Sequence, residues 1–154
     1  MGRRKIIKKN AQRLALGNNF RLYIDLEKKL AGRFFHRDVI ALVEALELGI
    51  SANGISHGAC AILMYVGRIA SATDADIVSS LLKKPEIYRK GESSFRMTIL
   101  NILGRIGTLA TVSDIESAKP FFDTIQDIPD DVYRRRESKE LLEAVSAIKS
   151  RYKS

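Results

Sequence analysis

The stretch that decides the fold is the segment GRIASATDADI at residues 67–77, which returns as GRIGTLATVSDI at residues 104–115. Each copy has the pattern of one helix end, a short turn and the start of the next helix. Thr73 and Thr111 are each followed three residues later by an aspartate, which is the spacing of a helix N-cap and an acidic third helical residue. Two copies of one helix–turn–helix joint predict an array of repeated helix pairs.

The spacing of acidic and apolar residues supports this array. Asp38, Asp76 and Asp114 are 38 residues apart, and each is followed by Val or Ile. Between these points, apolar residues at three- and four-residue spacing predict two helices per unit. The expected fold is therefore all-α, a short α–α superhelix of about three helix pairs with an N-terminal capping helix at about residues 20–30. The predicted repeats are residues 36–70, 73–107 and 111–152, within a single domain over residues 14–154.

Prolines and glycines are expected to define the helix ends. Pro85 is predicted to stop the first helix of the second repeat, and Gly49 and Gly107 are predicted to end helices as well. Gly104 is predicted to allow close packing between helices. Pro120 lies inside the first helix of the third repeat and predicts a kink or a new helix start there.

A family resemblance rests on Arg96, which stands eight residues before the Gly-Arg-Ile-Gly segment at 104–107. This pattern resembles the second helix of HEAT repeats of the phycobilisome-lyase type, within the armadillo-like α-solenoids. The resemblance covers residues 36–152. It implies that an arginine early in the second helix stabilises the stack, and Arg96 has that position. It also implies a more distant third function, a lyase-type chaperone that loads a chromophore, but Cys60 is predicted to be too buried to carry one.

The composition is that of an ordinary globular chain. Of its 154 residues, 45% are hydrophobic and 29% are charged, so the chain is long and apolar enough to form a core. Cys60 is the only cysteine and lies in an apolar run, which excludes a disulfide framework and favours a reducing compartment. The sequence has neither an apolar run of membrane-spanning length nor a signal-peptide pattern, and we therefore expect a cytoplasmic protein.

No combination of residues in the sequence predicts catalysis. The two histidines, His36 and His57, have no metal-ligand spacing with another histidine, cysteine or carboxylate. Residues 104–107 lack the lysine and the preceding strand of a phosphate-binding loop. We expect a protein without enzymatic activity, metal or cofactor.

The candidate partner-binding residues are arginines and tyrosines near helix ends. Arg68 and Arg105 have equivalent places near the ends of two second helices, where the helix dipole stabilises a cation and where a guanidinium also suits a carboxylate or phosphate. Two inter-helix loops carry equivalent Tyr-Arg pairs, whose tyrosines are expected to pack across the turn. The expected function is non-catalytic binding or scaffolding of a protein partner through the face of the second helices. The residues assigned to this partner site are Arg68, Arg96, Arg105, Tyr88, Arg89, Tyr133 and Arg134.

The positive charge is concentrated in the N-terminal quarter. Residues 1–37 hold eleven basic and two acidic residues, a net charge of +9, whereas the rest of the chain has a net charge of −1. Such a segment attracts polyanions, so the alternative function is binding of nucleic-acid phosphates. The simpler interpretation is a solubilising tail, with residues 1–13 as a basic, partly disordered leader. The candidate nucleic-acid-binding residues are Arg3, Arg4, Lys5, Lys8, Lys9, Arg13 and Arg21.

Overall fold

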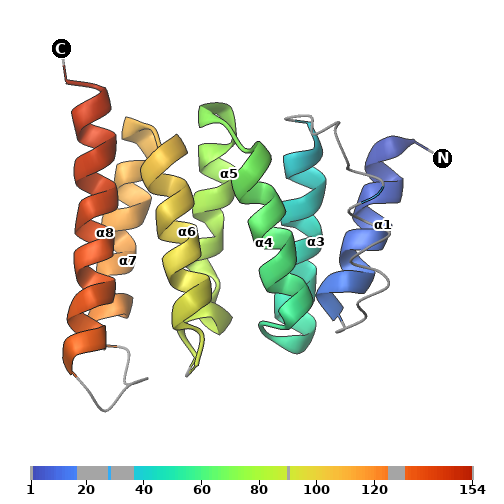
Figure 1. Ribbon diagram of the computed structural model, residues 1–154, viewed down its shortest axis with the longest axis horizontal. Helices are drawn as coiled ribbons and strands as arrows, with labels where there is room; N and C mark the ends of the chain where they lie inside the picture. Colours follow the sequence, from blue (N-terminus) through green and yellow to red (C-terminus); the bar gives the residue numbers. More distant parts are fainter. Residues whose placement is uncertain (1, 17–27, 29–36, 90, 125–130, 154) are drawn as a thin grey trace. The chain divides into compact units, whose positions relative to one another are not determined.

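The structure is a computed structural model that describes residues 2–16, 28, 37–89, 91–124 and 131–153, without the side chains of residues 3, 16 and 131–135. Throughout these ranges the chain forms helices and turns and contains no strand (Figure 1). The prediction of an all-α fold is confirmed for this part of the chain. The chain divides into two compact units, Met1–Asp74 and Ala75–Ser154. The sequence predicts one domain over residues 14–154 instead, and each unit is described here by itself.

The first unit contains α1 (Arg3–Leu16), α3 (Asp38–Asn53), α4 (His57–Ile69) and the 3-10 turn η1 (Ala72–Asp74). Helix α1 packs against both α3 and α4, and these two helices pack against each other (Figure 1). Their facing sides form a core in which α3 is the most apolar element. The fully buried residues of α3 include Val39, Ala41, Leu42, Val43, Ala45, Leu46 and Ile50.

Helix α1 corrects the expectation of a partly disordered leader at residues 1–13. Ile7, Ala11, Leu14 and Ala15 share one side of the helix and are at most 2% exposed. Two of these four core residues are alanines, so the apolar pattern is weak beside the many charges. The helix is stabilised by packing on α3 and α4 rather than by its local sequence. Apart from residue 28, the predicted capping helix at about 20–30 lies outside the described residues.

The end of α1 is held by two contacts. A Cβ on Gly49 of α3 would collide with the Cβ of Ala15, so the close approach of α1 and α3 depends on glycine. The hydroxyl of Ser56, the N-cap of α4, donates a hydrogen bond to the Ala15 carbonyl at 2.7 Å. The same hydroxyl accepts a hydrogen bond from the Ala59 N–H at 3.1 Å. Helix α1 is therefore an integral part of the first unit.

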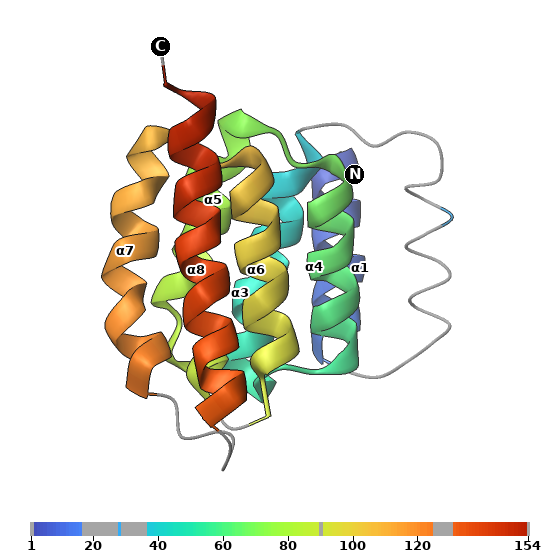
Figure 2. The same ribbon diagram turned by 60° about the vertical axis from the view of Figure 1, so that its left-hand side comes forward.

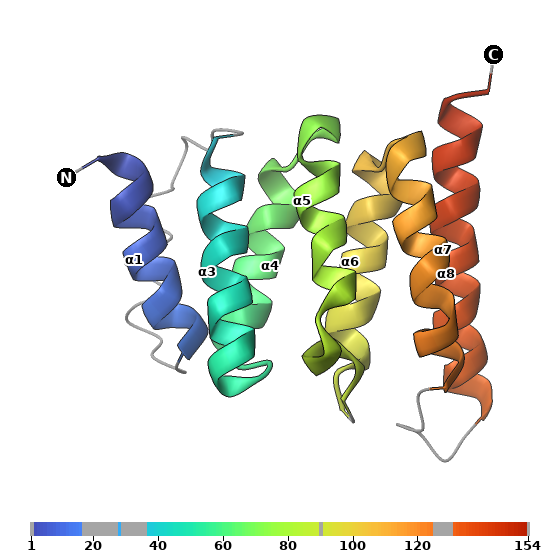
Figure 3. The same ribbon diagram turned by 180° about the vertical axis from the view of Figure 1, so that it is seen from behind.

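The second unit begins with α5 (Ala75–Ser79), which continues as the 3-10 turns η2 (Ser80–Lys83) and η3 (Pro85–Tyr88). The helices α6 (Ser93–Ile106), α7 (Leu109–Thr124) and α8 (Asp131–Arg151) follow. Helix α8 packs against both α6 and α7 (Figure 2). Helix α5 packs against α6 and α7, η2 contacts both, and η3 contacts α6 (Figure 3). The unit thus surrounds a core of its own.

Some of the predicted helix ends are confirmed and others are wrong. The η2 turn ends before Pro85, as predicted. Gly107 is the C-cap of α6, where its N–H donates to the Leu103 carbonyl at 2.7 Å, also as predicted. Gly49 does not end the first helix, because α3 continues to Asn53 and is capped by Gly54 at a φ of 71°.

The two predicted threonine caps are wrong. In the first joint, the N–H of Ser71 donates to the Asp74 carboxylate at 2.9 Å, so Asp74 organises the turn before α5 instead of Thr73. In the second joint, α7 begins at Leu109 and Thr111 lies inside its first turn. The Thr111 hydroxyl accepts from the Thr108 N–H at 2.9 Å and donates to the Thr108 carbonyl at 2.7 Å.

Two further features of the second unit bear on the site. Helix α7 runs through Pro120 to Thr124, so Pro120 does not start a new helix. Gly104 and Gly107 lie where α6 approaches α8. A Cβ on Gly104 would be 3.6 Å from the Cα of Ala144, an ordinary contact, so, contrary to the prediction, the approach of α6 to α8 does not require glycine at this position.

Candidate functional site

Arg96 is a structural residue and not a surface one. Its side chain is 0% exposed, and its guanidinium donates to Glu137 Oε1 at 3.1 Å and to Glu137 Oε2 at 3.4 Å. The third guanidinium nitrogen, Nη1, donates to the carbonyls of Ile87 at 2.8 Å and of Arg89 at 3.1 Å. The assignment of Arg96 to the partner-binding set is therefore corrected: its donors hold the η3 segment and α8 against α6. The family resemblance implies that Arg96 stabilises the packing of its helix, and in this structure its carboxylate partner is Glu137 of α8.

Arg68 and Arg105 are both exposed in the last turns of their helices, α4 and α6. The guanidinium of Arg68 lies 5.8 Å from the ring centroid of Tyr65, within the range of a cation–π contact. Both positions agree with the helix-dipole interpretation. The two residues belong to different units, so their predicted alignment along one edge stays a prediction.

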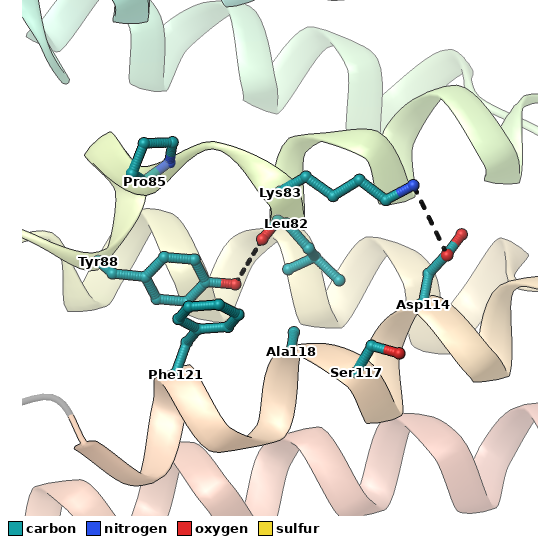
Figure 4. A pocket seen from close by; sticks show the side chains of 8 residues that line it. All are labelled: Leu82, Lys83, Pro85, Tyr88, Asp114, Ser117, Ala118 and Phe121. Carbon is teal, nitrogen blue, oxygen red and sulfur yellow. Dashed lines mark hydrogen bonds and ion pairs between the residues drawn. The ribbon is translucent and has the colours of Figure 1, made fainter.

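Tyr88 packs inward from the η3 turn, as expected of a tyrosine across an inter-helix loop. Its ring stacks on Phe121 with centroids 5.2 Å apart and meets Phe122 edge-on at 5.5 Å. Its hydroxyl donates a hydrogen bond to the Leu82 carbonyl at 2.6 Å (Figure 4). Burial raises the pKa of Tyr88 well above its usual value, and the nearby charge of Arg96 opposes this only in part. Arg89, the next residue, is exposed.

These aromatic residues form one end of a groove between the η2–η3 segment and α7. The groove has a volume of about 650 Å³. Figure 4 shows the ring of Phe121 beside Tyr88, with Leu82 and Ala118 along the floor and Pro85 at the rim. Phe121 is 56% exposed, which is unusual for so large an apolar side chain beside a concave surface. The groove therefore offers an unfilled apolar site next to an aromatic pair.

The other end of the groove is charged. Lys83 Nζ lies 3.9 Å from Asp114 Oδ1, at the limit of an ion pair, and the lysine side chain is 73% exposed. Asp114 also accepts a hydrogen bond from the Ser79 hydroxyl at 3.1 Å. Because Asp114 is held by Ser79 while Lys83 extends into solvent, the ammonium group is the part of this pair that can turn toward a ligand.

The face of the second helices has a different character in this unit. A hollow of about 510 Å³ lies between α6 and α8. Most of the residues that line it have polar side chains, among them Ser94, Thr98, Asn101, Arg136 and Glu140. In the first unit, the corresponding face of α4 exposes Met64 to 56%. Exposed aromatic surface is thus found in the α7 groove and not in the hollow between the second helices.

The basic residues of α1 divide into two groups. Arg4 and Lys8 both pair with Glu44 of α3, at 2.9 and 3.0 Å. The hydrogen bond from Lys8 is the main reason why the pKa of Glu44 lies below its usual value, and Arg4 adds to it. Lys5, Lys9 and Arg13, at four-residue spacing, are exposed on the side of the helix that faces away from its buried residues.

For four candidate residues of the sequence analysis, the structure does not describe the side chain. Arg21 lies outside the described residues, and Tyr133 and Arg134 are described only as backbone in the first turn of α8. The same holds for Arg3 at the start of α1.

Within the described ranges, no group of three or more His, Cys, Asp or Glu residues is arranged to hold a metal ion. None of the helices described is both long and apolar enough to cross a membrane. Cys60 is half-buried on α4 and not fully buried as expected. No protein-family model matches the chain, and no curated protein or solved structure is significantly similar to it. The HEAT-repeat resemblance stays a prediction.

Sequence reasoning missed the residues that complete these sites. In the sequence, Phe121 looks like any other apolar residue of its helix. Lys83 has no neighbouring pattern that distinguishes it from other charged surface residues. Glu137 follows three consecutive arginines, a pattern typical of a solvated segment, although its carboxylate is buried against Arg96. The one available signal was the 45-residue correspondence between Glu92 and Glu137, which marks the start of a second helix but not its long-range partner.

Proposed function

We propose that this protein is a non-catalytic helical-repeat binding module of the HEAT-like superhelix type, cytoplasmic, which engages a protein partner. The observation that supports the proposal best is the groove between the η2–η3 segment and α7 (Figure 4). An exposed aromatic side chain at a concave apolar surface is the typical anchor of a protein–protein contact.

The groove suits one kind of ligand, a peptide segment of a partner that carries an apolar side chain beside an acidic one. The apolar side chain would pack on Phe121 and Ala118. Its neighbouring carboxylate would pair with Lys83, which is the exposed cation of the groove. Tyr88 supports Phe121 from behind, and its hydroxyl is already bonded to Leu82, so the tyrosine acts as a platform and not as a hydrogen-bond donor to the ligand.

The face of the second helices, predicted from the sequence, is the alternative surface. Its exposed arginines in this unit include Arg105 of α6 and Arg136 of α8. The hollow beside α8 is polar and lacks a large exposed aromatic residue, so the observations favour the α7 groove.

The proposal can be tested by selecting peptides from a random display library on the immobilised protein. Enriched peptides should combine a large apolar residue with Asp or Glu. Phe121→Ala should weaken their binding by about tenfold, because it removes an anchor worth more than 1 kcal/mol. Lys83→Glu should shift the selected sequences from acidic to basic.

Leu109→Ala is the matched control. Leu109 lies on the same helix and is 55% exposed, close to the 56% of Phe121, but it does not line the groove. This variant should bind the selected peptides as the unchanged protein does. If no peptide is enriched, or if Phe121→Ala binds equally well, the groove is not the binding site. If Arg105→Gln alone abolishes binding, the face of the second helices is the site instead.

A further inference from the structure

A second surface, on the first unit, has a chemistry of its own. Lys5, Lys9 and Arg13 follow each other at four-residue intervals along α1, so they lie on one face of the helix. All three are exposed. A rise of 1.5 Å per residue separates successive cations by about 6 Å along the helix axis. We call these three residues the α1 cation row.

The row lies directly opposite the face that α1 buries. Ile7, Ala11 and Leu14 point into the unit, and at 100° per residue Lys9 lies about 180° around the helix from their mean direction. Among the described residues, no carboxylate pairs with the row, whereas Arg4 and Lys8 are both engaged by Glu44. The structure thus separates cations that hold α1 to α3 from exposed cations that pair with no carboxylate of the described residues.

An evenly spaced row of cations suits a ligand with evenly spaced negative charges. The phosphates of a nucleic-acid strand are such a ligand, and lysine and arginine side chains that meet them release condensed counterions. Helix α1 is fixed to the unit through Ala15, which contacts Gly49 and accepts a hydrogen bond from Ser56. The cations are therefore held in place before binding, which lowers the entropy lost on association.

The distribution of apolar residues on α1 disfavours an anionic membrane as the ligand. A helix that binds a bilayer surface places an apolar face in the lipid. The apolar face of α1 is already covered by α3 and α4. The outer face presents charged groups without a large exposed apolar residue among those described, so it cannot insert.

Of the side chains that read bases, the row has only cations, which can contact the edge of guanine. It has no aromatic side chain for stacking and no asparagine or glutamine among its three members. Contacts to phosphates position a protein without carrying sequence information. From these observations we propose that the α1 cation row binds the phosphate backbone of nucleic acid without sequence preference, a function beyond the partner binding assigned to the second unit.

The test is a salt titration of the full chain with a random-sequence DNA duplex and with single-stranded RNA. Three phosphate contacts predict a slope of log affinity against log salt of about −2.7 for duplex DNA, from −0.9 per contact. That slope corresponds to a loss of about 40-fold between about 50 and 200 mM salt. Lys5→Gln/Lys9→Gln/Arg13→Gln should reduce the magnitude of the slope by about 2.7, and Lys9→Gln alone by about 0.9.

A control of equal charge separates the row from the overall basic character. Lys139→Gln/Lys149→Gln/Lys153→Gln removes the same three charges from exposed positions at and after α8 and should leave the slope unchanged. Circular dichroism checks that each variant keeps its helix content. The proposal is overturned if the chain binds neither polymer at low salt, or if both triple variants lose affinity equally. Binding to phosphatidylserine vesicles that depends on the row, without binding to nucleic acid, would also overturn it in favour of a membrane.

Discussion

The guanidinium of Arg96 on α6 donates hydrogen bonds to both carboxylate oxygens of Glu137 on α8, and the two side chains are 0% and 4% exposed. The same guanidinium donates to the carbonyls of Ile87 and Arg89. One side chain therefore joins the η3 segment, α6 and α8, which are the elements behind the groove residue Tyr88. The rigidity of the proposed binding site depends on this buried pair.

Arg96→Met is expected to destabilise the protein by about 3–5 kcal/mol, because it leaves Glu137 as an uncompensated buried charge. Urea denaturation followed by circular dichroism measures this loss. Arg105→Met, on the exposed side of the same helix, should change stability by no more than about 0.5 kcal/mol. Arg96→Met/Glu137→Leu should be more stable than Arg96→Met, since the double variant removes both charges. A double variant that is less stable than Arg96→Met would contradict this interpretation.

Gly107→Ala and Gly104→Ala are expected to have opposite effects on stability. A Cβ at residue 107 would lie 2.8 Å from Ile148 Cγ1 and 2.5 Å from the Leu103 carbonyl oxygen, so α6 and α8 would have to separate. A Cβ at residue 104 meets Ala144 at ordinary contact distance. Inside a helix this change should stabilise the protein by about 0.5–1 kcal/mol. Thermal denaturation of both variants tests the difference, and a fall of equal size in both melting temperatures would refute it.

The stability of the protein is expected to fall at alkaline pH through Tyr88. Burial raises the folded-state pKa of Tyr88 above its unfolded value of about 10. The stabilisation is therefore complete below pH of about 10 and is lost as the pH rises from there toward the folded pKa. Urea midpoints measured on both sides of pH 10 should decline in the unchanged protein and less in Tyr88→Phe. Tyr152→Phe, at an exposed position after α8, should keep the full decline.

Glu44→Gln is expected to strengthen nucleic-acid binding. The pKa of Glu44 is lowered by Lys8 and Arg4, so its contribution to stability is present above its unfolded pKa and is lost as the pH falls through the folded value. Replacing the carboxylate releases both cations, which could steepen the salt slope by up to about 1.8 for a DNA duplex. It should also remove part of the acid-induced loss of stability. A slope identical to that of the unchanged protein would show that Arg4 and Lys8 do not reach the nucleic acid.

Features of the fold that depend on local sequence could be predicted. Apolar residues at three- and four-residue spacing indicate the helix pairs. Pro85 and Gly107 end helices because of the backbone properties of proline and glycine themselves. The threonine caps failed although they are local. At the first joint, the helical turn starts at Ser71, whose N–H donates to the Asp74 carboxylate, so the chain begins to coil two residues before Thr73.

Features that depend on distant residues could not be predicted. Arg96 and Glu137 are 41 positions apart, and nothing in their neighbourhoods identifies each as the partner of the other. The apolar pattern of α1 is weak because its closest contact is formed by two small residues, Ala15 and Gly49. Their small side chains allow the two helix backbones to approach closely but add little hydrophobicity to the sequence. Because α1 is a packed helix, its basic side chains divide into two that pair with Glu44 and three that are exposed along one face.

Because of Pro120, the last turn of α7 can move more easily than the rest of the helix when a ligand binds. Proline has no N–H, so the carbonyl of Glu116 receives no hydrogen bond from residue 120, and the turn that carries Phe121 is joined to the helix by fewer bonds. The Thr124 hydroxyl, which donates to the carbonyls of Pro120 and Phe121 at 3.0 and 3.2 Å, closes that turn on itself. The turn can therefore shift as a small unit. Its amide hydrogens should exchange with solvent faster than those in the middle of α7, and occupation of the groove should slow that exchange.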